Sequence, residues 1–425
     1  QLAERLPWAT FEEAFADLYS EEGRPAKPVR LMVALLLLKQ MFNLGDESVV
    51  ARWVENPYWQ FFCGLTYMQH ALPIDPSSLS RWRTRVGAER LEQLLEATIQ
   101  AALAMKALRP QEFHKVNIDT TVQEKAIAFP TDAKLLHAAI KGLNRLSQKH
   151  GVRLRQSYIR IAQRAAMMAG RYAHAKQFNR HRRQLRLLRT RLGRLIRDIR
   201  RKIAGQQQVE AAFETALSRA SQIRSQQQRQ RGWKLYSFHA PEVECIGKGK
   251  ASAPYEFGVK VSVVTTNARA PGGQFVLHAR ALPGNPYDGH TLRTVIENTQ
   301  KLTGCEIERA YVDKGYRGHD APHPRRVFIS GQKRGVFGAI KRELRRRSAI
   351  EPVIGHMKAE GHLGRCYLLG RCYLKGHAGD AANAVLTAVG YNFRRILAWL
   401  RMLLRPNLIA LLATFPIPPT PKQAS

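Results

Sequence analysis

The sequence predicts an α/β domain that is interrupted after its first strand by a basic helical segment and preceded by an all-helical region. Three observations lead to this prediction. Downstream of Pro110, short β-rich runs alternate with runs of helical periodicity. Upstream of Pro110 the periodicity is helical, and positive charge gathers between residues 134 and 205. Alternating strands and helices are typical of layered α/β domains.

Composition predicts a folded protein with a polyanionic partner. The chain has 425 residues, of which 44% are hydrophobic, and its 68 lysines and arginines outnumber 33 acidic residues to give a net charge of +35. Such a length allows roughly two to three domains with buried cores. The charge argues against an ordinary cytosolic enzyme, and the hydrophobic content argues against a disordered basic tail. A polyanion such as nucleic acid is the partner that this balance favours.

Nothing in the sequence predicts a membrane span or a disulfide framework. The apolar runs Leu31–Leu38 and Asn407–Pro416 fall short of the roughly 20 residues that a span requires. Five cysteines, an odd and sparse set, fit a reducing compartment better than an oxidising one. The sequence starts at Gln1 without an initiator methionine or a signal peptide, so we expect that the natural N-terminus is missing.

The first 110 residues form a helical region without excess charge, since 12 basic residues stand against 13 acidic ones. Apolar periodicity predicts helices over 28–42 and 47–62. Asp75 is a strong N-cap before a third helix. The apolar stripe of that third helix consists of Leu79, Trp82, Val86, Leu91, Leu94 and Leu95.

A break at Gly87 divides this third helix into two pieces, which resembles a helix-turn-helix. In such an arrangement Arg81 and Arg83 would point outward towards DNA. The alternative is a helical bundle whose arginines are only solvated, and the pattern leaves both interpretations open.

Residues 134–205 carry 21 basic residues and one acidic residue, Asp198. Leucine and isoleucine recur at spacings of three and four and form an apolar seam, which consists of Leu185, Leu188, Leu192, Leu195 and Ile199. This seam predicts a helix or a coiled-coil hairpin that buries it. Crowded arginines destabilise an isolated helix by roughly 0.2–0.5 kcal/mol per pair. Neutralisation by phosphates explains this pattern better than a solvated face, where both signs are usually mixed. We expect 206–231 to be a polar continuation or a linker.

Five β-rich runs and two helical runs make up the α/β domain. A Gly/Pro/Asn turn separates 255–266 from 272–282, which predicts an antiparallel hairpin. Helices are expected over 291–302 and 338–358. The other strands are expected over 115–122, 305–313 and 325–330.

Three acidic residues are candidates for one site. Asp119 ends an apolar strand, Asp313 ends another, and Glu351 lies on a helix after three arginines. Functional groups gather beyond the carboxyl ends of strands in open α/β sheets. Two carboxylates about 4 Å apart repel by about 4 kcal/mol at an effective dielectric of about 20, so such a cluster needs protons or cations. Oxygen ligands suit Mg²⁺ or Mn²⁺, and a pair of ions would activate a nucleophile and stabilise a leaving oxygen.

Three sequence blocks carry a resemblance to a known family. They are VNIDTTVQEKAIAFPTDAKLL around Asp119, AYVDKGYRG around Asp313 and RRRSAIEPVIGHMKAEGHLGR around Glu351. The third block contains the signature Arg, three residues, Glu, six residues, Lys, as Arg347, Glu351 and Lys358. With these blocks the chain resembles the DDE transposases of bacterial insertion sequences, in the insertion-sequence-five group and its relatives.

The resemblance implies a division of the chain and a partner. It implies a ribonuclease H-like catalytic core over 111–132 and 233–404, a helical, DNA-binding domain over 1–110, an arginine-rich insertion over 133–232 and a tail over 405–425. It also implies a cytoplasmic, nucleoid-associated protein that binds terminal inverted repeats and target DNA, at least as a homodimer when DNA is bound.

The resemblance further implies an activity, which is Mg²⁺-dependent cleavage at the element's ends and strand transfer into target DNA. The metal ligands would be Asp119, Asp313 and Glu351. Arg347 and Lys358 would position phosphates. Further DNA contacts are expected from Arg81, Arg83, Arg183, Arg186 and Arg194.

Two departures from the family keep other interpretations open. Leu344 stands where the family often has tyrosine, and LGRCYL occurs twice in tandem between Leu363 and Leu374. One alternative is therefore an inactive transposase relic that only binds DNA, and another is a ribonuclease H-type nuclease. A zinc site at Cys366 and Cys372 is disfavoured by their spacing. Asp288 could lie near the active site, although helix capping is the simpler role.

Overall fold

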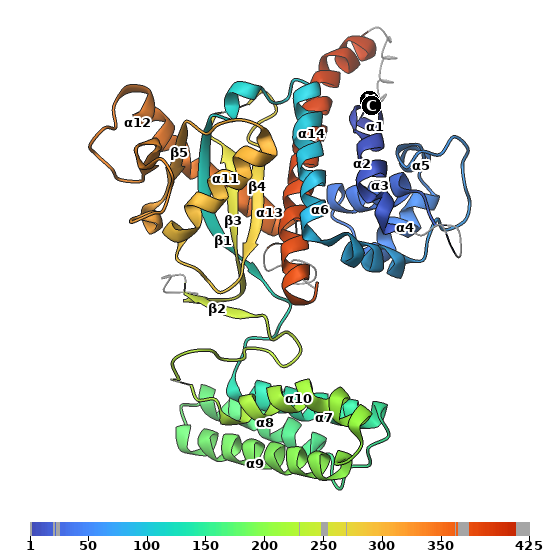
Figure 1. The fold of residues 1–425 in the computed structure, drawn as a ribbon, viewed down its shortest axis with the longest axis vertical. Coiled ribbons are helices and arrows are strands. Elements are labelled where there is room, and N and C mark those ends of the chain that lie inside the picture. The colour runs from blue at the N-terminus through green and yellow to red at the C-terminus, as the bar shows by residue number, and fades with distance from the viewer. Residues whose placement is uncertain are drawn as a thin grey trace, which may run out of the picture. The chain divides into compact units, whose positions relative to one another are not determined.

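The N-terminal part of the chain is helical in the computed structural model (Figure 1). The structure describes residues 2–19, 22, 26–228, 230–247, 254–268, 270–361, 363 and 374–413. The N-terminal helices are α1 (Leu2–Arg5), α2 (Trp8–Phe15), α3 (Val29–Met41), α4 (Asp46–Val54), α5 (Pro57–Phe62) and α6 (Pro76–Ala104).

Local sequence signals decide where these helices begin and end. The single helix predicted over 47–62 is wrong, because Asn56 caps a new helix by accepting a hydrogen bond from the Trp59 amide at 3.0 Å, with Pro57 in its first position. Asp75 caps α6, as predicted, by accepting a hydrogen bond from the Ser77 amide. The break at Gly87 is confirmed, since its φ of 75° is one that glycine adopts easily.

A mixed sheet follows. Its strands are β1 (Lys115–Glu124), β2 (Glu244–Gly247), β3 (Tyr255–Thr266), β4 (Val276–Leu282), β5 (Arg309–Val312) and β6 (Val327–Ile329). The strand order is β2-β3-β1-β5-β6, and β4 pairs with β3. β3 and β4 form the predicted antiparallel hairpin, whereas β1, β5 and β6 are parallel neighbours. The sheet therefore confirms a mixed α/β fold, and β2 was not predicted.

Helices accompany the sheet in the C-terminal half: α11 (Leu292–Thr303), α12 (Gly338–Arg345), α13 (Ile350–Glu360) and α14 (Gly376–Ala413). The continuous helix expected over 338–358 is instead broken by a 3₁₀ turn, Arg346–Ala349. The long helix α14 packs against α6, α3 and β4. Asn392 in α14 joins it to β4, because its side chain exchanges hydrogen bonds of 2.8 and 2.9 Å with the backbone of Val276.

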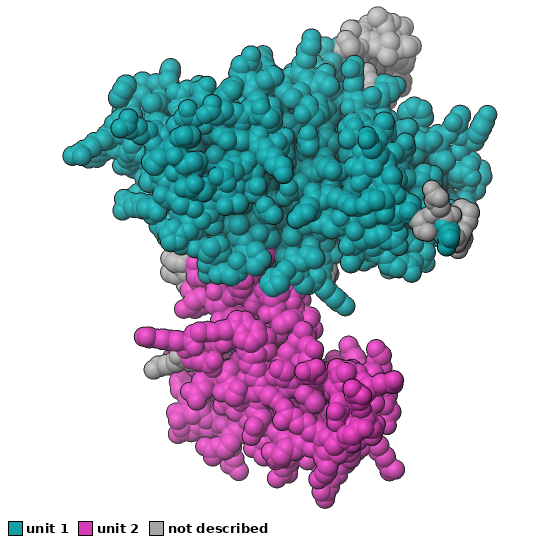
Figure 2. Space-filling model, in the orientation of Figure 1, with its two compact units in different colours: residues 1–124, 260–425 teal, residues 125–259 magenta. Residues whose placement is uncertain are grey.

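The chain divides into two compact units, residues 1–124 with 260–425, and residues 125–259 (Figure 2). The described residues of the second unit form four helices, α7 (Asp132–Lys149), α8 (Ile159–His174), α9 (Phe178–Ile203) and α10 (Gln207–Ser225). The predicted leucine seam of α9 is buried inside this bundle. Of the two alternatives for 206–231, a polar continuation or a linker, the linker is wrong for α10, which buries Phe213, Leu217 and Ile223 in the same core.

The described residues bear on the absence of a membrane span and on the tandem repeat. No helix among the described residues is both long and apolar enough to cross a membrane. The tandem LGRCYL repeat lies outside the described residues except for its terminal positions, Leu363 and Leu374. The cysteines of the disfavoured zinc site, Cys366 and Cys372, also lie outside them.

Candidate active site

The parallel pairing of β1 and β5 brings Asp119 and Asp313 together. The register pairs Asn117 with Tyr311, and each aspartate lies two residues beyond its own member of that pair. Side chains two residues apart point to the same face of a strand. The two carboxylates consequently lie on one face of neighbouring strands. The expectation that Asp119 ends its strand is wrong, because β1 continues to Glu124.

Asp119 lies in a half-buried environment that disfavours its charge. Its side chain is 17% exposed, and its Oδ1 accepts a hydrogen bond from the Thr120 amide at 2.8 Å. Burial, followed by the negative charge of Asp313, raises the pKa of Asp119 to about 6. A pKa that is raised by burial and by a neighbouring carboxylate is typical of functional sites.

Asp313 lies where β5 turns into a short 3₁₀ helix, Lys314–Tyr316. Its Oδ1 accepts a hydrogen bond from the Gly315 amide at 2.8 Å, which fixes the carboxylate over the turn. A Cβ atom at Gly315 would lie 3.0 Å from Oδ1 of Asp313 and 3.3 Å from Oδ2 of Asp288. A side chain at position 315 would therefore press against both carboxylates and shift them.

Asp288 is a third acidic residue beside the pair, and its position near the site is now established. Its Oδ1 accepts hydrogen bonds from Lys260 Nζ at 3.0 Å and from Thr120 Oγ1 at 3.1 Å. Thr120 is the residue next to Asp119 in β1, so this contact ties Asp288 directly to the strand that carries Asp119. Lys260 supplies a compensating charge from β3.

Arg347 links Glu351 to this group. Its Nη1 lies 3.5 Å from Oδ2 of Asp119, and its Nη2 lies 3.3 Å from Oε1 of Glu351. The Arg347 side chain is only 13% exposed, whereas that of Glu351 is 64% exposed. The guanidinium therefore lies between the two carboxylates and connects Glu351 with Asp119.

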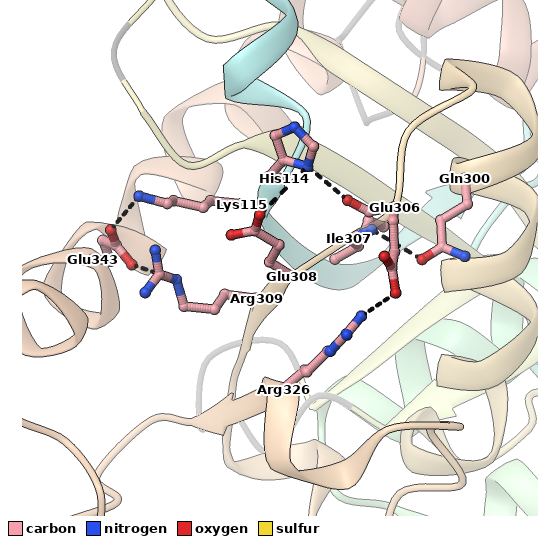
Figure 3. Close-up of polar contacts among 9 residues, drawn as sticks. All are labelled: His114, Lys115, Gln300, Glu306, Ile307, Glu308, Arg309, Arg326 and Glu343. Atoms are coloured by element: carbon pink, nitrogen blue, oxygen red, sulfur yellow. Dashed lines mark hydrogen bonds and ion pairs between the residues drawn. The ribbon is translucent and has the colours of Figure 1, made fainter.

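A hydrogen-bond network around Glu343 holds α12, the helix that leads to Arg347 (Figure 3). Glu343 accepts a hydrogen bond from Lys115 Nζ at 2.9 Å, pairs with Arg309 Nε at 3.2 Å and binds the Tyr311 hydroxyl. Burial alone would raise the pKa of Glu343, but Tyr311, Lys115 and Arg309 outweigh it and lower that pKa. The network fastens α12 to the first residues of β1 and to β5.

Asn267 holds the 3₁₀ turn Arg346–Ala349, which follows α12. Its Nδ2 donates hydrogen bonds to the Glu343 carbonyl at 2.9 Å and to Asn117 Oδ1 at 2.7 Å. Its own carbonyl accepts a hydrogen bond from Arg346 Nε at 3.0 Å. The residue before Arg347 is thereby tied to the strand that carries Asp119, and this explains how Arg347 reaches that aspartate.

The carboxylates of the site are of the type that could bind a hard divalent cation. Asp119, Asp288 and Asp313 offer only carboxylate oxygens, which are the ligands that Mg²⁺ and Mn²⁺ prefer. The Tyr316 hydroxyl lacks a hydrogen-bond partner among the described residues although the side chain is 1% exposed, and burial and the three aspartates raise its pKa. Still, no group of three or more acidic, histidine or cysteine side chains among the described residues lies close enough to hold a metal ion.

The residues predicted to contact DNA differ in how far they are exposed to solvent. Lys358 lies half-buried in α13, seven residues beyond Glu351. Arg81 is exposed. The outward orientation expected for Arg83 is wrong, because this side chain is buried and pairs with Asp46 at 3.2 Å. Arg183, Arg186 and Arg194 are exposed on α9 of the second unit.

Sequence reasoning missed two members of the site, Lys260 and Tyr316. Tyr316 lies within the AYVDKGYRG block, three residues after Asp313, so the block itself was a usable signal. Lys260 occupies a polar position between Val259 and Val261 in β3, where a lysine is ordinary in a strand. Only its contact with Asp288 identifies it.

Comparisons with known proteins agree with part of this picture. Residues 1–85 match the family described as Transposase domain (DUF772). A relative from Rhizobium meliloti, "Uncharacterized protein ORF8 in nfe locus", is 55% identical over 178 residues, which is 42% of this chain and 86% of the relative. No solved structure matches the chain. The N-terminal part of the chain is therefore similar to a transposase domain, and the chain belongs to the same family as ORF8 of the Rhizobium meliloti nfe locus.

Proposed function

We propose that this protein is a DDE transposase that cleaves DNA at the ends of its insertion sequence and joins them to target DNA. The observation that carries the proposal is the juxtaposition of Asp119 and Asp313 on neighbouring parallel strands, with Glu351 joined to Asp119 through Arg347. The N-terminal transposase match supports the same class of function. In this proposal the sheet is a ribonuclease H-like core.

Each side chain has a role that its surroundings support. Asp119 and Asp313 would hold Mg²⁺ or Mn²⁺, with Glu351 as the third ligand. Bound ions of this kind activate a water or hydroxyl nucleophile and stabilise the leaving oxygen of a phosphodiester. Arg347 would neutralise Asp119 in the free protein and bind a DNA phosphate when Glu351 turns inward. Its charge and forked donors suit either partner.

The supporting residues keep the carboxylates in place without touching the reacting atoms. The Gly315 amide holds the Asp313 carboxylate, and Lys260 and Thr120 hold that of Asp288. The Glu343 network fixes the helix before Arg347. Because catalysis of phosphoryl transfer depends on positioning and charge, these contacts would be needed for full activity.

The DNA partner has more than one expected contact surface. Terminal inverted repeats and target DNA would both lie along basic surfaces, since duplex DNA carries one negative charge per about 1.7 Å. Exposed arginines of α9 supply such a surface. Joining two ends would require at least a homodimer on DNA.

A cleavage assay tests the proposal. A supercoiled plasmid that carries the DNA flanking the gene is incubated with the protein and Mg²⁺, and nicked and linear products are separated on a gel. We expect metal-dependent cleavage that Asp313→Asn abolishes. Glu308→Gln, an exposed acid just before β5, is the matched control and should cleave normally. DNA binding without any cleavage would indicate the relic, and cleavage only of RNA–DNA hybrids would indicate a ribonuclease.

A further inference from the structure

A groove between α9 and α10 of the second unit gathers four arginines. Its lining residues are Arg182, Leu185, Arg186, Arg189 and Thr190 from α9 and Arg224 from α10, and it encloses about 300 Å³. There is no aspartate or glutamate among them. A row of guanidinium groups in one groove is unfavourable unless an anion neutralises it.

Two of the four guanidinium groups are held in place by the protein. Arg189 donates a hydrogen bond from Nη2 to Asp132 Oδ2 at 3.2 Å and lies 3.5 Å from the Gln226 carbonyl. Arg224 donates from Nε to the Arg189 carbonyl at 3.3 Å. A fixed guanidinium binds an oxyanion at a lower entropic cost than a flexible one.

Gly193 makes room for Arg224. A Cβ atom at position 193 would lie 2.6 Å from Arg224 Nε and 3.0 Å from its Cζ, although the backbone of this helical residue has ordinary geometry. Glycine inside a helix costs roughly 1 kcal/mol relative to alanine. The glycine therefore serves the close approach of the Arg224 side chain to α9.

The other two arginines are exposed and have the spacing of one helical turn. Arg182 and Arg186 lie four residues apart on α9, so they are neighbours on its surface. The other end of α9 is different, because Asp198 there pairs with Arg201 at 2.8 Å and with Lys202 at 3.1 Å. At the arginine groove, Asp132 pairs with Arg189 at 3.2 Å, and no acidic residue is among the described residues that line the groove.

The length of the basic surface indicates a polymer as the ligand. Helix α9 has 26 residues, which corresponds to roughly 39 Å at 1.5 Å per residue. Exposed arginines occur along this length outside the groove as well, at Arg180, Arg183, Arg194, Arg197 and Arg200. A free phosphate would occupy the groove alone, whereas a nucleic acid backbone would also meet these outer arginines.

We propose that the groove formed by Arg182, Arg186, Arg189 and Arg224 is a phosphate-binding site for the backbone of duplex DNA. This inference rests on the proposed function, since it assigns the surface of the second unit that holds the DNA. Of the α9 arginines that the sequence predicts as DNA contacts, Arg186 lines the groove, whereas Arg183 and Arg194 belong to the outer arginines along the helix.

The test measures DNA binding by fluorescence anisotropy with a labelled duplex, in EDTA and over a range of salt concentrations. The double variant Arg182→Gln, Arg186→Gln should bind roughly tenfold more weakly, and its log-log salt slope should fall by about 1.8, or 0.9 for each phosphate contact. The matched control is Arg160→Gln, Arg164→Gln, which removes two exposed arginines at the same spacing from α8. This control should change the affinity less than threefold.

Two variants test the geometry. Arg224→Lys keeps the charge but loses the forked donors, and Gly193→Ala displaces Arg224. Each should weaken DNA binding at least threefold while thermal unfolding confirms that the protein is folded. Equal losses in the groove variant and the α8 control would overturn the proposal, and so would tighter binding of polyglutamate than of DNA.

The outcomes separate this inference from the proposed function. Because EDTA prevents metal-dependent cleavage, binding is measured alone, and Asp313→Asn should bind DNA as the wild type does. An inactive protein that still loses binding in the groove variant would refute the transposase proposal but keep the DNA site. An active protein whose groove variant binds normally would refute the site alone.

Discussion

Arg347 lies between the carboxylates of Asp119 and Glu351, with its Nη1 3.5 Å from Asp119 Oδ2 and its Nη2 3.3 Å from Glu351 Oε1. One guanidinium therefore offsets part of the negative charge in a group where burial and Asp313 raise the pKa of Asp119. The same arginine is the first residue of the signature that the sequence shares with DDE transposases. Its position makes Arg347 a competitor of any cation that binds Asp119.

Replacing Arg347 should lower both the maximal cleavage rate and the Mg²⁺ concentration that is needed for half-maximal cleavage. In Arg347→Gln the site loses a positive charge, so the Mg²⁺ concentration for half-maximal cleavage should fall, by roughly threefold. The maximal cleavage rate should fall at least tenfold because a phosphate contact is lost. A Mg²⁺ titration of the cleavage rate measures both quantities. Arg342→Gln, an exposed arginine in α12, is the control, and an unchanged maximal rate in Arg347→Gln would contradict the assignment.

Glu343 should act as a positioning residue. Glu343→Gln removes the charge that pairs with Lys115 and Arg309, which should lower the free energy of unfolding by about 1–2 kcal/mol. The cleavage rate should fall while the Mg²⁺ requirement stays the same, because the carboxylates of the site are unchanged. Denaturant unfolding and a Mg²⁺ titration test this. A shifted Mg²⁺ requirement would mean that Glu343 acts on the metal site itself.

The half-buried ion pairs of Asp46 should make the N-terminal region sensitive to acid. Burial alone would raise the pKa of Asp46, but Lys39 and Arg83 outweigh it and lower that pKa. A lowered pKa in the folded state stabilises the protein above the pKa of the unfolded state, and this contribution is lost as the pH falls through the lowered value.

The corresponding variant is Asp46→Asn. It should lower the free energy of unfolding by about 2 kcal/mol at neutral pH, because Lys39 and Arg83 stay behind with little exposure. The difference from the wild type should shrink below about pH 4. Denaturant unfolding at several pH values measures it, with the exposed Glu47→Gln as control. A difference that stays constant down to pH 2 would show that charge is not the cause.

The sequence was most informative where signals were local. Apolar runs followed by aspartate located the strands of Asp119 and Asp313, and Gly87 marked the kink in α6. The Asn56-Pro57 pair was also a readable start signal, but the apolar periodicity on both sides of it led to one predicted helix instead of two.

Non-local contacts account for the errors and omissions. Arg83 looked like a surface arginine because its partner, Asp46, lies 37 residues earlier in the chain. The sequence around Asp288 could not show that this residue belongs to the site, because its hydrogen-bond partners Thr120 and Lys260 lie 168 and 28 residues away along the chain. The parallel register that sets Asp119 beside Asp313 depends on pairing across almost two hundred residues, which no local pattern encodes.

The central claim is that Asp119 and Asp313 bind a divalent cation together. Electron paramagnetic resonance of free Mn²⁺, titrated with the protein in the absence of DNA, tests it most directly, because bound Mn²⁺ loses its sharp signal. We predict saturable Mn²⁺ binding that is lost in both Asp119→Asn and Asp313→Asn and retained in Glu308→Gln. Equal Mn²⁺ binding by all four proteins, or binding by none of them, would contradict the claim.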